Sequence, residues 1–338
     1  MLYKLLSVEN YTPSNIGDYI QALAATQFLP RIDGFINRED LSDYAGEECK
    51  VIMNGWYMHN PQKWPPSCKI HPLFVSLHIN IHVESTMLST EGIKYLKQHE
   101  PIGCRDEHTR DTLRSNGVDA YFSGCLTLTL GNKYTTSNRG ADVFFVDPHI
   151  PKENHIGILL KDALFMLEHP RLTCDLSNRM RVGASKIKNL LRTARFGRLY
   201  SQVFSHDTLL CAKYVSQEND DYSLLSNEER LQEAERLVRM YSQAALVVTS
   251  RIHCALPSLG MGTPVYFVQR ANDKIGSSCR FGGLIDLFNV IKVSSNKVDC
   301  PFMKKDKLSL RNIVPNKETW KVLASSLTDR CSAFVNND

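Results

Sequence analysis

Arg251 and His253 stand two residues apart, directly after an apolar run at 244–248. A segment with helical character, 254–260, and a Gly-Thr-Pro turn separate them from a second apolar run at 265–268. Short apolar runs bounded by Gly and Pro, with a helical segment between them, predict a strand–helix–strand unit in a buried parallel sheet. Ligands of such sheets bind beyond the carboxyl ends of the strands, beside helix N-termini that favour anions. A fixed cation and a titratable imidazole there predict an anionic substrate and proton transfer.

A second set of polar residues lies at a turn near the start of the chain. Asn15, Gly17 and Asp18 follow the predicted strand 2–8 and precede a predicted helix at 19–29, for which Asp18 is the expected N-cap. Gly17 would let a ligand approach the backbone, and the two polar side chains could bond sugar hydroxyls. A capped turn without a ligand explains the same residues equally well.

Aromatic residues are concentrated after the next predicted strand, 49–54. Two Trp, one Tyr and two His lie between Gly55 and Pro72 in a Pro-rich loop. Aromatic rings suit the apolar faces of sugars, and loops at strand ends carry function disproportionately. Trp56 is therefore a candidate for sugar contact, whereas Trp64 is better explained as a plug packed over the core.

Two histidines, His78 and His82, lie near the end of a further predicted strand, 73–81. A histidine in a strand is more often structural than catalytic. Two of them at a strand end, downstream of the aromatic loop, remain candidates for the site.

Arg105 repeats the arrangement of a cation at a strand end. It follows a short predicted strand at 102–104, and Asp106 is expected to cap the helix that runs to Ser115. The next predicted strand is 120–122. The succession of strand, polar end and helix continues from residue 1 to about 130, which predicts a doubly wound α/β domain.

A second series of elements begins with a predicted strand at 142–146. It continues with predicted helices at 157–168 and 227–242 and a predicted strand at 208–213. Between Asp175 and Asp207 there is no acidic residue but there are seven cations, Arg179, Arg181, Lys186, Lys188, Arg192, Arg195 and Arg198. Such charge runs are usually solvated faces; the alternative for the stretch 179–198 is contact with lipid phosphates or an anionic acceptor at a membrane surface.

The chain beyond residue 268 completes the expected organisation. A basic loop, 269–274, and the Gly-containing segment around Arg280 could close over an anion, with Arg280 the best placed cation. A final helix is expected near 317–327. We therefore expect an N-terminal α/β domain at 1–135, a C-terminal α/β domain at 140–300, and a partly helical tail at 301–338.

The composition is that of an ordinary globular protein. The 338 residues are 43% hydrophobic and 22% charged, with a net charge of +4. Ten cysteines are scattered without a CxxC pair, which argues against a zinc or redox motif. A secretory signal and a run long enough to span a bilayer are both missing from the sequence, and a cytoplasmic location is expected. No nucleic-acid partner is expected.

The turns described above occur in a recognisable order. The sequence resembles the polysaccharide pyruvyl transferase family over about residues 10 to 270, at Asn15-Ile16-Gly17-Asp18, Asn54-Gly55-Trp56, Gly103-Cys104-Arg105-Asp106, Ser250-Arg251-Ile252-His253 and Gly262-Thr263-Pro264. The resemblance implies two Rossmann-like domains facing a cleft, similar to GT-B glycosyltransferases. It also implies transfer of pyruvate from phosphoenolpyruvate onto two sugar hydroxyls, giving a cyclic ketal on a surface polysaccharide.

The resemblance also suggests which residues take part. Phosphoenolpyruvate carries a carboxylate and a phosphate, which guanidinium groups bind bidentately. Arg251 and His253 are then the catalytic pair, Arg251 holding the donor anion and His253 transferring protons. Ser250, Arg105 and Arg280 are further donor-binding candidates. The acceptor-binding candidates are Asn15, Gly17, Asp18, Asn54, Trp56, His78 and His82. Neither a metal nor a cofactor is expected.

Other interpretations remain open at this stage. A GT-B-type glycosyltransferase with a nucleotide-sugar donor would use Arg251 for the diphosphate, and an inactive glycan-binding or scaffolding protein would use neither residue. Arg251 could instead form an interdomain salt bridge and His253 a hydrogen bond in the core. The acceptor sugar, and whether it is free, nucleotide-linked or lipid-linked, is not specified by the sequence.

Overall fold

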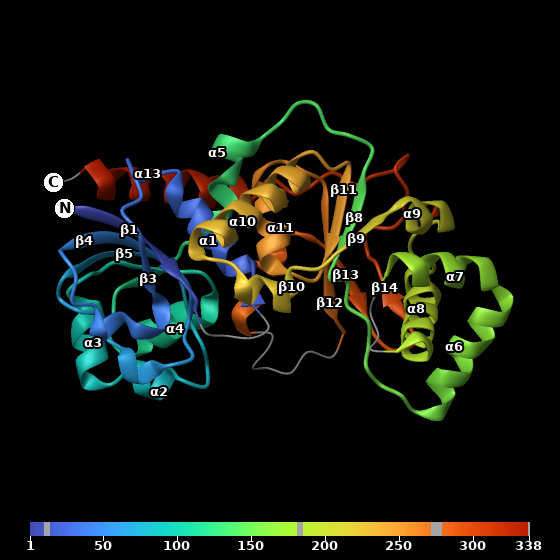
Figure 1. The fold of residues 1–338 in the computed structure, drawn as a ribbon, viewed down its shortest axis with the longest axis horizontal. Coiled ribbons are helices and arrows are strands. Elements are labelled where there is room, and N and C mark those ends of the chain that lie inside the picture. Colours follow the sequence, from blue (N-terminus) through green and yellow to red (C-terminus); the bar gives the residue numbers. More distant parts are fainter. Residues whose placement is uncertain (10–13, 181–184, 272–278, 337–338) are drawn as a thin grey trace.

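Two six-stranded sheets, each dominated by parallel pairing, organise the protein. We describe residues 1–9, 14–180, 185–271 and 279–336 of a computed structural model, shown in Figure 1. Sheets whose helical crossovers cover both faces are built from apolar strands, and the strand residues are correspondingly buried. The prediction of two α/β halves built on parallel sheets is confirmed.

The first sheet belongs to the N-terminal half and is parallel throughout. Its strands, in sheet order, are β3 (Phe35–Asn37), β1 (Leu2–Ser7), β4 (Cys49–Tyr57), β5 (Ile70–Ile79), β6 (Ile102–Cys104) and β7 (Ala120–Phe122). The helical segments of this half are α1 (Gly17–Thr26), η1 (Arg38–Asp43), η2 (Pro61–Lys63), α2 (Glu84–Met87), α3 (Thr90–Lys97), α4 (Glu107–Ser115), η3 (Leu126–Leu130) and α5 (Gly131–Tyr134). Asp106 caps α4 as predicted, because its side chain accepts a hydrogen bond from the Thr109 N–H.

The second sheet carries one antiparallel edge strand, β14, beside β13. Its strands, in sheet order, are β14 (Val298–Asp299), β13 (Asn289–Val293), β12 (Val265–Arg270), β11 (Leu246–Thr249), β8 (Val143–Val146) and β9 (Lys213–Val215). Its helical segments are α6 (Ile156–Glu168), α7 (Pro170–Arg179), α8 (Lys186–Tyr200), α9 (His206–Cys211), η4 (Asp220–Leu224), α10 (Asn227–Ser242), α11 (Ile252–Gly260), η5 (Cys279–Phe281) and η6 (Ile285–Leu287). The opening strand–helix–strand unit is therefore β11–α11–β12, as predicted.

One predicted strand is wrong. Most of the segment 208–213 forms the helix α9, and β9 begins only at Lys213. The Ser205 side chain caps α9 by accepting a hydrogen bond from the Thr208 N–H. A short apolar run does not distinguish a buried strand from a buried helical turn. Here the cap formed by Ser205 favours the helix.

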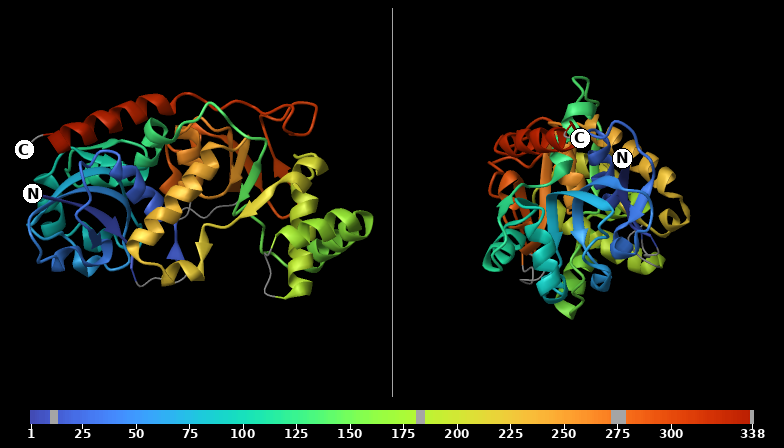
Figure 2. Two further views of the ribbon diagram at one scale, coloured as in Figure 1. Left: turned by 45° about the horizontal axis from the view of Figure 1, so that its top comes forward. Right: turned by 90° about the vertical axis from the view of Figure 1, so that its left-hand side faces the viewer.

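Helices α6, α7 and α8 form a module at one end of the molecule (Figures 1 and 2). The module packs on the second sheet through α8, where Phe196 and Tyr200 contact Phe145 of β8 with ring centroids 5.8 and 5.9 Å apart. Helix α6 lies farther from the sheet than α8. Among the helices in the described part of the chain, none is long and apolar enough to cross a bilayer.

The two halves are joined through a shared core. Apolar side chains of α1, such as Ile20 and Leu23, belong to the same buried cluster as Leu237 of α10 and Leu256 of α11. A two-stranded antiparallel ribbon also links them, because β10 (Glu218–Asn219) pairs with β2 (Ser14–Asn15). These contacts fix the carboxyl ends of the two sheets in relation to each other.

The C-terminal helix α13 (Trp320–Asn336) returns from the second half and lies over the first sheet (Figures 1 and 2). Leu327 and Cys331 are buried there, and the ammonium of Lys50 on β4 donates a hydrogen bond to the Phe334 carbonyl. The helix predicted near 317–327 is present and extends further. The tail is thus part of the surface of the N-terminal half.

Candidate active site

A cavity of about 1010 Å³ lies between the two halves, where the strands of both sheets end. The N-terminal half contributes Asn15 and Asp18 of the β2–α1 turn, Arg38, Trp56 and Arg105 to its wall. The C-terminal half contributes Asp147, Glu218, Arg251, His253, Arg270 and Arg280. Residues that are far apart in the sequence therefore share one cleft, and most of the charged ones are cations.

The helix α1 begins at this cleft with a close contact between the two halves. The Asn15 side chain accepts a hydrogen bond of 2.9 Å from the Gly17 N–H. A Cβ atom on Gly17 would lie 3.1 Å from His253 Nδ1, so the absent side chain lets α1 approach that imidazole. The predicted capping role of Asp18 is wrong: Asp18 lies inside the first turn of α1.

Arg105 presents an uncompensated charge to the cavity. Its side chain is buried, with 2% of the residue exposed, and neither Nε nor Nη1 has a hydrogen-bond partner among the described residues. Burial lowers the pKa of Arg105, although the nearby Asp106 carboxylate acts in the opposite direction. A guanidinium remains charged at neutral pH. Buried charges are normally paired, so this arrangement is suited to an incoming anion.

His253 stands at the start of α11 and is buried as well. Its Nε2 atom has no hydrogen-bond partner in the described part of the structure. The pKa of His253 lies well below its ordinary value, first because of burial and then because of the positive charges of Arg105, Arg280, Arg38 and Arg251. A pKa shifted in this direction keeps the imidazole neutral at pH 7.

Arg251, two residues earlier, is in a different electrostatic position. Its Nε lies 2.9 Å from Asp147 Oδ2 and its Nη1 lies 2.7 Å from Glu218 Oε1. Burial acts to lower the pKa of Arg251, but the two carboxylates outweigh it and the pKa is raised. Ser250 is engaged too, because its hydroxyl donates to the Asp147 carbonyl at 2.6 Å. Arg251 thus lines the cavity with its charge already matched.

The comparison with known proteins assigns the family. A model of the polysaccharide pyruvyl transferase family matches residues 15–272, which is most of the chain. The chain belongs to this family. The matched range contains Arg105, Arg251 and His253, whereas Arg280 and α13 lie beyond it.

Other comparisons add little for this family member. No curated protein matches the chain. A solved structure of an uncharacterized protein from Klebsiella pneumoniae subsp. pneumoniae NTUH-K2044 is 14% identical, with a TM-score of 0.43, over 87% of this chain and 93% of that chain.

Arg38 is one of the cleft residues of this pyruvyl transferase family member that were missed from the sequence, as were Asp147 and Glu218. Its guanidinium is buried, bonds Glu39 Oε1 at 3.1 Å and Asp18 Oδ1 at 3.2 Å, and lies 5.4 Å from the centre of the Trp56 ring. It holds the Asp18 carboxylate at the cavity wall. The only available signal was the short apolar run 35–36 before it, which forms β3.

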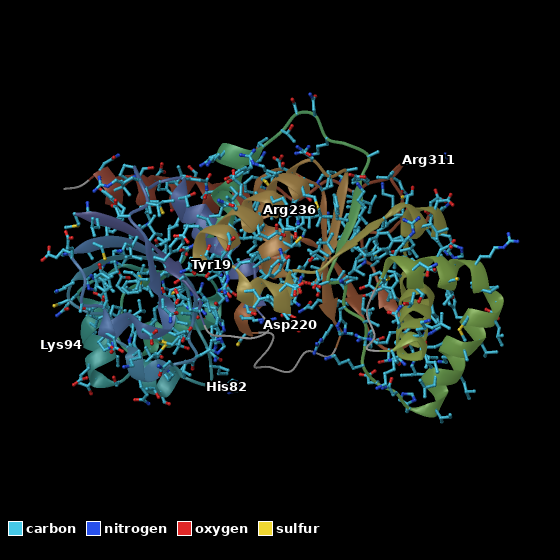
Figure 3. The ribbon with its side chains drawn as sticks, in the orientation of Figure 1. Tyr19, His82, Lys94, Asp220, Arg236 and Arg311 are labelled. Atoms are coloured by element: carbon cyan, nitrogen blue, oxygen red, sulfur yellow. The ribbon has the colours of Figure 1, made fainter. Side chains whose placement is uncertain are left out.

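Four predicted acceptor residues, Gly17, Asn54, His78 and His82, are not among the described residues that line the cavity. Asn54 is buried and donates to the Gln21 carbonyl at 2.9 Å. His78 lies 2.6 Å from Asp106 Oδ2 and has a pKa lowered to about 4, chiefly by burial. His82 is exposed at the edge of the molecule shown in Figure 3. The side chains of Asn54, His78 and His82 therefore lie away from the cavity wall.

The basic stretch 179–198 does not form a single solvated face. Arg179 and Arg192 line the cleft, while Lys186 and Lys188 are exposed. Arg195 and Arg198 each bond the buried Asp162 carboxylate at 2.8 Å. Arg181 lies outside the described residues. Two of the cations, Arg195 and Arg198, are therefore bound to a buried carboxylate. Two others, Arg179 and Arg192, lie at the wall of the cleft.

The basic loop expected after β12 is described only in part. Gln269 and Arg270 line the cavity, and residues 272–274 lie outside the described residues. Arg280 also lines the cavity, with its guanidinium carbon 4.7 Å from the centre of the Phe281 ring. The structure therefore brings Arg280 to the predicted cleft.

Proposed function

We propose that this protein transfers the pyruvate unit of phosphoenolpyruvate onto two hydroxyls of a sugar to form a cyclic ketal. Membership of the family supports pyruvyl transfer in polysaccharide synthesis. The choice of donor rests on two residues that line the same cavity. Arg105 is a buried cation without a hydrogen-bond partner among the described residues, and His253 is a neutral imidazole. Such a site suits a small dianion or trianion that also needs a proton.

In this proposal Arg105 binds the donor anion, with Arg280 as a second cation. The first turns of α1 and α11 add partial positive charge to the same place. Arg251 is less suited than predicted to neutralise the donor, because Asp147 and Glu218 already balance its charge. We assign Arg251 to positioning the start of α11, and hence His253.

The reaction then follows from charge compensation. The donor carboxylate and phosphate offset the arginines that, after burial, lower the pKa of His253, so donor binding raises this pKa and favours protonation of the imidazole. His253 delivers that proton to the methylene carbon while one sugar hydroxyl attacks C2. The second hydroxyl closes the ring and phosphate leaves. The products are one ketal and one inorganic phosphate, and the hydroxyl protons pass to His253 and to phosphate.

The N-terminal wall suits the acceptor. Asn15 and Asp18 offer polar groups for sugar hydroxyls, and Trp56 offers a ring for an apolar sugar face. Arg38 holds both Asp18 and Trp56 in place. Because Arg105 belongs to the same wall, the donor would lie beside the acceptor there, with Arg280 and His253 of the C-terminal half facing both.

The decisive experiment is incubation of the protein with phosphoenolpyruvate and a panel of sugar diols. We expect release of inorganic phosphate together with the mass of a pyruvate ketal on one acceptor, and loss of both with Arg105→Met. Transfer of a sugar from a nucleotide sugar, without phosphate release from phosphoenolpyruvate, would contradict the proposal in favour of a glycosyltransferase. Absence of turnover with either donor, in a folded protein, would favour the inactive glycan-binding alternative.

A further inference from the structure

Helix α6 exposes an apolar stripe to solvent. The exposed fractions are 73% for Ile156, 57% for Leu160, 57% for Leu164 and 75% for Leu167. Spacings of four, four and three residues place all four side chains on one side of a helix. The opposite side is also apolar, because Ile158 and Phe165 are buried. Because α6 is apolar on its outer side as well as its inner side, it exposes an apolar patch whose contact with water is unfavourable.

The stripe belongs to a helix that is firmly held. Asp162, on the inner side of α6, accepts hydrogen bonds from Arg195 and Arg198 of α8. The Lys161 ammonium donates to Asn296 Oδ1 at 2.9 Å. These contacts fix the orientation of α6, which lies at one end of the molecule (Figure 1), so its four exposed apolar side chains form a stable face.

The same module concentrates positive charge. Residues 150–200 contain ten Lys and Arg and four Asp and Glu, a net charge of +6, whereas the whole chain carries only +4. The rest of the chain is therefore slightly acidic. Exposed cations of this region are Lys152, Lys161, Arg171, Arg179, Lys186 and Lys188. Ile187, 74% exposed, lies between the last two.

We propose that α6 and the start of α8 dock onto an anionic lipid surface. Aliphatic side chains flanked by cations are typical of helices that lie in the membrane interface, where lipid headgroups balance the charge. A second copy of the chain would bring another net charge of +6 against the first. The charge therefore favours an acidic membrane over self-association as the partner of this face.

Docking would bring the cleft close to the bilayer. Arg179 at the end of α7 and Arg192 in α8 belong to the module of helices α6 to α8, and both line the cavity. If the proposed reaction is correct, an acceptor sugar carried on a lipid would reach the cleft from this side. The docking proposal itself does not depend on that reaction, since it rests on α6 and the charge around it.

The test is co-sedimentation of the full-length protein with vesicles of phosphatidylcholine, or of phosphatidylcholine mixed with phosphatidylglycerol. We expect binding to the mixed vesicles only, weakened by added salt. Replacing Leu160, Leu164 and Leu167 together by Gln removes most of the stripe and should weaken binding about tenfold or more. Leu224→Gln is the matched control, because Leu224 is 84% exposed on η4. That variant should bind like the wild type.

Three results would overturn the docking proposal. The wild type does not bind mixed vesicles; the triple variant binds them as well as the wild type; or light scattering shows a dimer that the triple variant abolishes. All positions changed are exposed, and circular dichroism checks that the variants are folded. Ketal formation on a soluble diol should be equal in the wild type and the triple variant. Vesicle binding without any ketal formation would leave docking standing and refute the proposed reaction.

Discussion

The two walls of the cleft carry their arginines in opposite ways. On the N-terminal wall Arg105 is buried and without a hydrogen-bond partner among the described residues. On the C-terminal wall Arg251 is held by two carboxylates, Asp147 and Glu218. The motif around Arg251 is the stronger sequence signal, yet the charge of Arg251 is already balanced by these two carboxylates. Which cation receives an anionic substrate is decided by the charges around it, and these come from elsewhere in the chain.

The largest effects should come from exchanging the two arginines, one at a time, for Met. Arg105→Met should reduce kcat/KM for phosphoenolpyruvate about 100-fold or more, because the substrate anion loses its main hydrogen-bonding cation. Its stability should be equal to or above that of the wild type, since an unpaired buried charge is removed. Arg251→Met should instead lower stability by about 1–3 kcal/mol, because Asp147 and Glu218 lose their partner.

Steady-state kinetics and urea unfolding measure the two effects. Arg251→Lys serves as the control that keeps the charge but not the paired geometry. A destabilised Arg105→Met together with an unchanged Arg251→Met would reverse the comparison and make Arg105 the structural residue.

The protonation of His253 provides the second test of the comparison. Its pKa is low because of burial and of arginines from both walls, so donor binding should be accompanied by uptake of a fraction of a proton near pH 7. Titration calorimetry in two buffers of different ionisation enthalpy measures that uptake. His253→Gln should reduce activity about 100-fold and remove the uptake that belongs to the imidazole. Identical uptake in this variant would assign it to the donor phosphate instead.

The same low pKa predicts how stability depends on pH. The folded pKa of His253 lies below the unfolded value of about 6.5. Its contribution is therefore fully present above pH 6.5 and is lost as the pH falls toward the folded pKa.

The smallest effect should follow from closing the gap between the walls at Gly17. In Gly17→Ala the new Cβ would lie 2.9 Å from Asn15 Oδ1 and 3.1 Å from His253 Nδ1. We expect kcat to fall about tenfold through displacement of the imidazole, with little change in stability. Gly157→Ala is the matched control, because its nearest neighbour would be His155 Nδ1 at 3.7 Å, an ordinary contact. Equal kcat values for both variants would show that the close approach has no bearing on the reaction.

Much of this cleft could be predicted because parallel sheets gather their strand ends. Apolar runs located β6, β8 and β11, and the residues after β6 and β11 include Arg105, Arg251 and His253. The pairing of Arg251 with Asp147, 104 residues earlier, leaves no trace in local sequence. Arg38 was missed for a related reason, since the short segment around it carries no recognisable motif.

The side on which a strand residue faces was harder to predict. His78 lies near the end of β5 as expected, but it turns toward the cap of α4 and bonds Asp106. The seven cations of the stretch 179–198 look equivalent in sequence, yet Arg195 and Arg198 are drawn inward by Asp162. Trp64 was correctly interpreted as a core residue, and it packs against Tyr57, Phe74 and Tyr95.

The position of α13 has a consequence for how the protein is made. Strand β7 completes the first sheet at Phe122, but the helix that covers part of that sheet begins only at Trp320. A chain synthesised from its N-terminus must therefore carry an unfinished first half while the entire second half emerges. The surface beneath α13, including Tyr121 under Arg330, stays uncovered during that interval. Translation order thus makes the N-terminal half, although it is made first, the last to be completed.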